Sequence, residues 1–234
     1  MANSARQSDI GPLQQRLGYQ FHNTQLLRLA LTHKSYAKQN NERLEFVGDA
    51  VLGYLVGSML YRKYPNVQED SLSLMRAELV RGRTLASLAK EIGLAPLLLL
   101  GSGELKSGGR ERHSILANAV EAIIGATHED GGIQACVELV DKLYAQRLEN
   151  LDAQSLKDAK TQLQELLQGQ GLELPVYEIQ DVSGADHQRQ YCVSCSVSAL
   201  DKRASASASS RRGAEKAAAQ LVLREVHNEG IDHE

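Results

Sequence analysis

Residues 42–52 read Glu-Arg-Leu-Glu-Phe-Val-Gly-Asp-Ala-Val-Leu, which is the pattern of a helix with one acidic stripe. At about 100° per residue, Glu42, Glu45 and Asp49 fall within about 60° of arc. The other faces are apolar, which predicts a mostly buried helix. Like charges one turn apart destabilise a helix, so a half-buried acidic stripe indicates a bound cation. Hard divalent ions such as Mg²⁺ take carboxylate, water and phosphate oxygens as ligands.

A second polar pair interrupts another apolar helix further along the chain. Asn118 and Glu121 are three residues apart, and Leu116, Val120 and Ile123 occupy the other directions of that helix. A cation held by both stripes would supply the Lewis acid and the activated water that phosphodiester hydrolysis needs. A structural calcium site would instead show closely spaced ligands in one loop, and the sequence has no such loop. Glu69 is a further acid, although at the start of a helix a carboxylate also simply complements the macrodipole.

Composition limits the function classes. The chain has 234 residues, 42% hydrophobic content and a net charge of -3, so it can form two cores but has no overall basic character. Three cysteines without paired zinc spacing fit a reducing cytosol. The polar amino terminus does not read as a signal sequence, and the apolar stretches are too short for a transmembrane span. We therefore expect a cytoplasmic protein without membrane contact.

Apolar spacing divides the chain into two regions. From Pro12 to about residue 150 it is helical almost throughout, with a glycine-rich flexible loop expected at 101–109 and a helix break at Gly131-Gly132. After a short polar linker, helical spacing at 157–168 gives way to alternating runs at 176–182, 190–199 and 203–208, then to a helix at 211–226. The prediction is an all-α domain followed by a small α+β domain of α-β-β-β-α order. The biased stretch 204–210 is interpreted as an edge strand running into a loop, with a disordered linker as the alternative.

The second region carries a possible phosphate-binding corner. Arg211, Arg212 and Lys216 place positive charge at the start of the last helix, beside free backbone donors. Polar side chains on the 157–168 helix and in the turn between the first two strands could contact ribose hydroxyls: Thr161, Gln164, Glu165 and His187. Each signal is weak alone, but together they fit a reader of A-form RNA shape. Aromatic residues for stacking single strands are scarce.

The motifs together resemble one family. Residues 41–52 closely resemble the signature of bacterial ribonuclease III, and similar landmarks follow the same order at 32–35, 76–80, 100–109 and 115–125. Residues 157–227 resemble the double-stranded RNA-binding domain that follows in that enzyme. The resemblance predicts a ribonuclease III domain at 1–150, a linker at 151–156, the RNA-binding domain at 157–227 and a polar tail at 228–234.

The resemblance also implies roles for individual residues. Glu45, Asn118 and Glu121 become magnesium ligands, with Mn²⁺ as a possible substitute, and Asp49, Glu121, Glu42 and Glu69 become catalytic or auxiliary acids. It implies a homodimer in which Phe46 enters the partner subunit. The implied reaction is hydrolysis of double-stranded RNA to 5′-phosphate and 3′-hydroxyl ends, in the processing of ribosomal, messenger and transfer RNA.

Three departures from the family pattern affect this prediction. Asn118 stands where aspartate is usual, so we expect metal affinity to be kept but weakened. Ala206 and Ala208 replace glycines before the last helix, and Asp70 replaces a common glycine. Two rival interpretations are a non-cleaving regulator that binds duplex RNA, with Asn118 marking a disabled centre, and a metal phosphohydrolase acting on small nucleotides. The retained acids argue against the first, and the second leaves the carboxyl-terminal region without a purpose.

Overall fold

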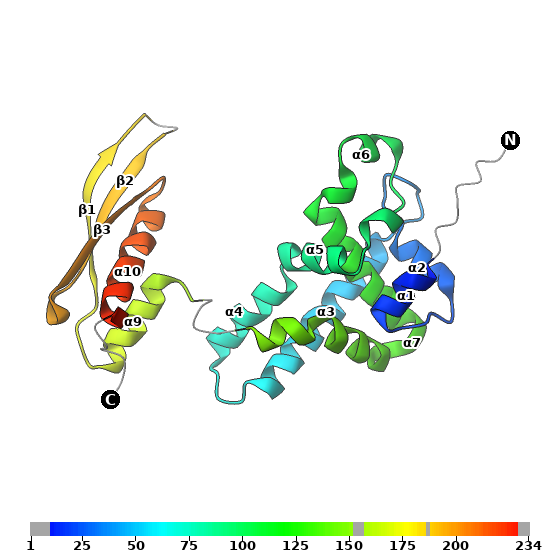
Figure 1. The fold of residues 1–234 in the computed structure, drawn as a ribbon, viewed down its shortest axis with the longest axis horizontal. Helices are drawn as coiled ribbons and strands as arrows, with labels where there is room; N and C mark the ends of the chain where they lie inside the picture. Colours follow the sequence, from blue (N-terminus) through cyan, green and yellow to red (C-terminus); the bar gives the residue numbers. More distant parts are fainter. Residues whose placement is uncertain (1–9, 152–156, 186–187, 229–234) are drawn as a thin grey trace. The chain divides into compact units, whose positions relative to one another are not determined.

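The structure is a computed structural model that describes residues 10–151, 157–185 and 188–228. The chain divides into two compact units between residues 153 and 154, where the sequence predicts a linker. Each unit has its own core. The amino-terminal unit is helical, and the carboxyl-terminal unit has the order α-β-β-β-α, so the predicted fold class is confirmed (Figure 1).

The amino-terminal unit is built around two long helices that cross. Its elements are α1 (Gly11–Leu17), α2 (Thr24–Ala30), α3 (Glu42–Lys63), α4 (Glu69–Val80), α5 (Gly82–Glu91), the short η1 (Ala95–Leu97), α6 (Ser102–Lys106), η2 (Gly109–Glu111) and α7 (His113–Glu149). The largest packing contact joins α3 and α7, and α5, α2 and α4 pack around this pair (Figure 1). The range of α7 comprises two helical segments that meet at the predicted break. Gly132 has φ 73° and ψ -171°, a non-helical conformation that only glycine adopts readily, and the two segments join there through a kink.

The long helix α3 has the length and apolar composition of a membrane span, whereas the sequence analysis expects its apolar stretches to be too short for one. Only part of the helix is buried, by packing against α7 and α4. One face stays exposed, however: Phe46 is 79% exposed, Tyr54 65% and Tyr61 75%. The prediction of a mostly buried helix is therefore wrong for this face, which the neighbouring α4 covers only in part.

The glycine-rich segment 101–109 is more ordered than the sequence predicts. It contains α6 and the start of η2, and the amide of Gly101 donates a hydrogen bond to Ser35 Oγ at 2.9 Å. A Cβ on Gly101 would lie only 2.2 Å from the carbonyl oxygen of Ser35, so this contact requires glycine. The close approach joins the segment to the loop just before α3.

The carboxyl-terminal unit is a three-stranded antiparallel sheet with helices on one face (Figure 1). It comprises α9 (Ala159–Gly169), β1 (Val176–Ser183), β2 (Gln190–Val197), the short η3 (Ser198–Leu200), β3 (Lys202–Ala208) and α10 (Arg211–Asn228). The strand order is β1-β2-β3, so β3 is an edge strand, as the stretch 204–210 predicted. Its core includes Leu163, Leu167, Cys195, Val222 and Val226.

Candidate active site and RNA-binding surface

Two glycines bring the two acidic helices together. A Cβ on Gly48 would lie 1.7 Å from the carbonyl oxygen of Glu121, and one on Gly125 would lie 2.1 Å from that of Leu44. The backbones of α3 and α7 therefore touch at this crossing, which a side chain on either glycine would prevent. Sequence reasoning missed this role, although glycine inside an apolar helix is the available signal.

The crossing places carboxylates from both helices within electrostatic range. Burial, followed by the charges of Asp49 and Glu45, raises the pKa of Glu121 from 4.5 to about 7. Burial also raises the pKa of Glu45, a hydrogen bond from the Asn118 side chain lowers it, and Glu42 and Asp49 raise it. Glu45, Asn118 and Glu121 are partly buried, whereas Asp49 is exposed at the rim. The structure thus brings together four of the predicted site residues: Glu45, Asp49, Asn118 and Glu121.

Two further predicted acids differ in their relation to this group: the charge of Glu42 still raises the pKa of Glu45, whereas Glu69 is not among the charges that shift Glu45 or Glu121. Glu42 is exposed and accepts a hydrogen bond from Lys34 Nζ at 3.0 Å, which lowers the pKa of the Glu42 carboxyl. Glu69 lines a groove of about 510 Å³ on the exposed face of α3, together with Tyr54, Tyr61 and Arg76. Its carboxylate accepts a hydrogen bond from Ser73 Oγ at 2.8 Å. Within one chain, Glu69 is therefore a neighbour of the aromatic face and not of Glu121.

The donor set of the acidic group fits a hard divalent cation. Within the described parts of the chain, no three His, Cys, Asp or Glu side chains come close enough to form a metal site by themselves. Glu45 and Glu121 supply carboxylate oxygens. The side-chain NH2 group of Asn118 donates a hydrogen bond to Glu45, which leaves its carbonyl oxygen available to a cation. Burial and, after it, repulsion between the carboxylates raise the pKa values of Glu45 and Glu121, and a cation would neutralise the negative charge that both disfavour.

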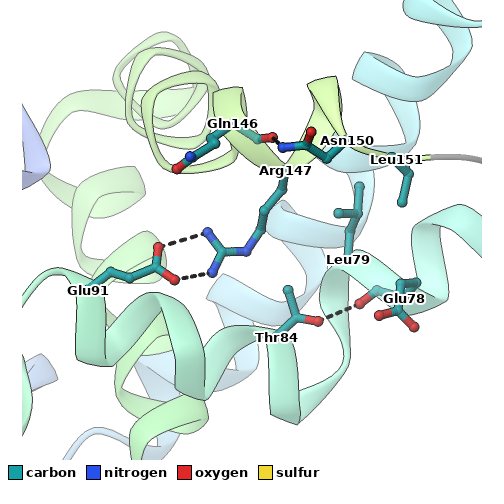
Figure 2. A pocket seen from close by; sticks show the side chains of 8 residues that line it. All are labelled: Glu78, Leu79, Thr84, Glu91, Gln146, Arg147, Asn150 and Leu151. Carbon is teal, nitrogen blue, oxygen red and sulfur yellow. Dashed lines mark hydrogen bonds and ion pairs between the residues drawn. The ribbon is translucent and has the colours of Figure 1, made fainter.

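A separate pocket of about 350 Å³ contains none of the predicted site residues. Figure 2 shows Arg147 held by the Glu91 carboxylate, at 2.9 and 2.5 Å, beside Thr84 and Leu79. Ser87 Oγ also accepts a hydrogen bond from Arg147 at 3.2 Å. These contacts join α5 to the last turns of α7, so the pocket marks a structural junction.

In the carboxyl-terminal unit, the predicted RNA-binding residues lie at the start of α10 and along α9. Thr161 and Gln164 are exposed on α9, and the nearby Gln168, which the sequence analysis left out, continues the same polar stripe. Glu165 is held by Lys157 Nζ at 2.7 and 2.8 Å. His187 lies outside the described residues.

Ion pairs fix the predicted phosphate-binding corner. Glu215 accepts hydrogen bonds from Arg211 Nε at 2.9 Å and from Lys160 Nζ at 2.6 Å. Lys216 Nζ lies 3.2 Å from Asp158, whose carboxylate also caps α9. Arg212 is exposed. The amino-terminal ends of α9 and α10 thus form one polar surface, held together by Glu215 and Asp158, which the sequence analysis had not singled out.

Comparison with known proteins agrees with this architecture. A ribonuclease-III-like family model matches residues 23–148, and a double-stranded RNA binding motif matches residues 159–226. The chain is 48% identical over 222 residues to Ribonuclease 3 of Vibrio vulnificus strain YJ016, covering 94% of this chain and 99% of the relative. It is 50% identical over 219 residues to Ribonuclease 3 of Ralstonia pickettii strain 12J, covering 93% and 86%.

Solved structures give the same result for the amino-terminal unit. The nuclease domain of ribonuclease III from Campylobacter jejuni aligns with a TM-score of 0.59 and 41% identity, over 62% of this chain and 99% of that domain. A second structure of that domain, at 43% identity, TM-score 0.56 and coverage of 58% and 99%, is described as flexible in a region involved in dimer formation. The catalytic unit is therefore a ribonuclease III-type endoribonuclease, followed by a double-stranded RNA-binding unit. The chain belongs to the ribonuclease III family.

Proposed function

We propose that this protein is a magnesium-dependent homodimeric endonuclease that hydrolyses double-stranded RNA. The observation that carries the proposal is the electrostatic coupling of Glu121 on α7 to Glu45 and Asp49 on α3. Such repulsion between partly buried carboxylates is costly unless a ligand offsets it. A divalent cation and the phosphates of the substrate are ligands that use oxygen donors of this kind.

Glu45, Asn118 and Glu121 would hold the ion, and Asp49 would bind solvent at the exposed rim. When bound, a divalent ion neutralises developing charge on the phosphoryl oxygens and makes water a stronger nucleophile. Water attacks phosphorus as the bond to the ribose 3′-oxygen breaks. The products are therefore a 5′-phosphate and a 3′-hydroxyl end. Mn²⁺ would substitute, because it accepts the same oxygen ligands.

The polar surface of α9 and α10 supports duplex RNA as the substrate. Thr161 and Gln164 offer side-chain groups for ribose hydroxyls, while Arg212 and Lys216 offer charge for the phosphates at the start of α10. Recognition of A-form RNA relies on this combination of minor-groove and phosphate contacts. His187 remains a predicted contact. The proposed cellular substrates are ribosomal RNA precursors and structured messenger and transfer RNA transcripts in the cytoplasm.

The exposed face of α3 supports pairing of two copies. Three aromatic side chains, Phe46, Tyr54 and Tyr61, are at least 65% exposed on this face. The groove beside them includes Gly53 and Gly57, which leave room for an incoming side chain. If two α3 helices pack antiparallel about a two-fold axis, Phe46 of each copy meets the groove of the other. This arrangement also brings Glu69 of one copy towards the acidic end of the other α3, where an auxiliary acid has a use.

The test is cleavage of a long uniform RNA duplex with Mg²⁺ or with EDTA, followed on a denaturing gel with end-group analysis. We expect metal-dependent cleavage, and a loss of at least about 100-fold in rate for Glu121→Gln. Glu138→Gln, an exposed change on the same helix, is the matched control. Duplex binding without cleavage in Mg²⁺ or Mn²⁺ would refute the proposal in favour of a non-cleaving regulator.

A further inference from the structure

The free edge of β3 and the adjoining side of α10 form a surface that the proposed function does not use. Within the described residues, β3 pairs only with β2, so one side of its backbone is left without strand partners. Its register with β2 runs from Lys202 to Ala208 without a bulge. Natural edge strands are usually protected by bulges, prolines or charged side chains. In β3 the charges Lys202 and Arg203 stand at one end only, and the other five residues are alanine and serine. Such an edge is suited to pairing with another strand.

One side of α10 faces this edge. A Cβ on Gly213 would lie 3.1 Å from the Cβ of Ala208 at the end of β3, whereas Lys216 contacts Asp158 at the start of α9. Residues four and eight positions after Gly213 continue along the β3 side of the helix. These are Ala217 and Leu221, and Leu221 is 38% exposed. An exposed leucine therefore accompanies the free strand edge.

The dimensions of the two elements place Leu221 beside the middle of β3. A two-residue turn connects β3 to α10, so the helix runs back along the strand. Ser205 precedes Ala208 by three residues, or about 10 Å of strand. Leu221 follows Gly213 by eight residues, or about 12 Å of helix. Ser205 and Leu221 therefore lie at a similar level along the edge.

We propose that this edge binds the same edge of a second copy of the chain, with the two β3 strands antiparallel and the two-fold axis at Ser205. The two sheets then become one sheet of six strands. Helix α10 packs on both β3 and β2, so its axis lies between the two strands. It is displaced from β3 towards β2 by about half of the strand spacing of about 4.8 Å. The two α10 helices are then about 10 Å apart, which is the normal distance for helix packing. The two Leu221 side chains meet near the axis.

Charge at the edge is compatible with this pairing. Arg203 lies near one end of β3 and is 3.8 Å from Glu178 across the sheet. About an axis at Ser205, antiparallel pairing puts each Arg203 opposite Ser207 of the other copy, so the two arginines do not meet. The neutral surface of small residues on one copy therefore contacts the same surface on the other copy, as an isologous interface requires.

Disulfide trapping tests the geometry in the full-length chain. Ser205→Cys, combined with Cys192→Ser to remove the partly exposed native thiol, puts two thiols on the axis at a Cα separation that a disulfide spans. Ser198→Cys in the same background is the control, because Ser198 is exposed outside the strands. We expect oxidation to link Ser205→Cys at least about tenfold faster than the control. Equal rates would overturn the proposal.

Sedimentation tests the interaction without any new thiol. Phe46→Asp removes the proposed α3 contact, and the remaining self-association is then measured with Ser205→Lys, Leu221→Arg or Ser198→Lys added. The first two should weaken it by about tenfold or more, equivalent to about 1.4 kcal/mol, and the last should not. A Phe46→Asp chain that is monomeric at high concentration would overturn the proposal. The β3 edge would then be expected to pair with a strand of another protein. Because Phe46 and β3 belong to different units, failure of one contact is distinguishable from failure of the other.

Discussion

The side chain of Asn118 on α7 donates a hydrogen bond to the carboxylate of Glu45 on α3. An aspartate at position 118 would place a fourth carboxylate beside Glu45, Asp49 and Glu121 and would repel Glu45. Asparagine therefore avoids this repulsion in the absence of metal, and its hydrogen bond opposes the rise in the Glu45 pKa that burial causes. The cost is one negative charge less for attracting a cation.

We predict that Asn118→Asp strengthens metal binding. The Mg²⁺ concentration for half-maximal cleavage should fall by about tenfold, and Mn²⁺ affinity measured by calorimetry should rise in parallel. Asn150→Asp adds the same charge near the end of α7, away from the acidic group, and should change neither value. Unchanged affinity in Asn118→Asp would show that position 118 does not contact the ion.

Removal of metal should make stability depend on pH through Glu121. The folded pKa of about 7 lies above the ordinary 4.5, so the folded state binds more protons between these values. Stability in EDTA should therefore fall as pH rises from about 4.5 to about 7 and then level off. Thermal unfolding of the wild type and Glu121→Gln checks this, because the glutamine variant should lose most of the slope. Saturating Mg²⁺ should also flatten the curve for the wild type by favouring the ionised carboxylate.

Gly48→Ala should disrupt the α3–α7 crossing. The added methyl group would occupy the position of the Glu121 carbonyl oxygen, and backbone cannot move aside as a flexible side chain can. We expect a loss of about 3 kcal/mol or more in the free energy of unfolding, measured by urea titration. Gly103→Ala, in a helix where a Cβ meets no atom within 4 Å, should be neutral or slightly stabilising. A crossing that tolerated alanine at 48 would contradict the close contact.

Asp130 anchors the turn between α1 and α2 to α7. Its carboxylate accepts hydrogen bonds of 2.8 Å from Tyr19 Oη and from the amides of His22 and Asn23. These bonds outweigh the effect of burial and lower the Asp130 pKa, so the stabilisation is present above about pH 4 and is lost as pH falls through the folded value. Asp130→Asn should lower the free energy of unfolding by about 1–3 kcal/mol near neutral pH. The new side-chain NH2 group would face a donor in place of one of the oxygens that now accept hydrogen bonds. Asp141→Asn, exposed on the same helix, is the control in denaturant titrations.

Arg212→Ala should weaken duplex RNA binding without altering the cleavage chemistry. Loss of one phosphate contact should reduce the salt dependence of log Kd by about one. Arg224→Ala, at the other end of α10, should leave the slope unchanged. Filter binding over a range of salt concentrations, with EDTA to prevent cleavage, distinguishes the two.

Much of this architecture was predictable from local sequence. Helical and alternating spacing identified both units, and the i, i+3, i+4 pattern identified the acidic stripes on α3 and α7. The way the stripes meet was not predictable, because it depends on Gly48 and Gly125 approaching backbone from a distant segment. The location of Glu69 beside the α3 aromatic face, away from Glu121, depends in the same way on tertiary packing. Segment 101–109 contains α6 and the start of η2 where the sequence predicts a flexible loop, and the close approach of Gly101 to Ser35 was not predictable from local sequence.

The kink at Gly132 separates two tasks between the two helical segments of α7. The residues before it carry Asn118 and Glu121 to the crossing with α3, and the residues after it join α5 through Arg147. Because the bend interrupts the regular helical geometry, a change of register or length after residue 132 need not rotate the acids before it. Evolution can therefore remodel the part of α7 after the kink while the acidic residues before it keep their alignment with α3.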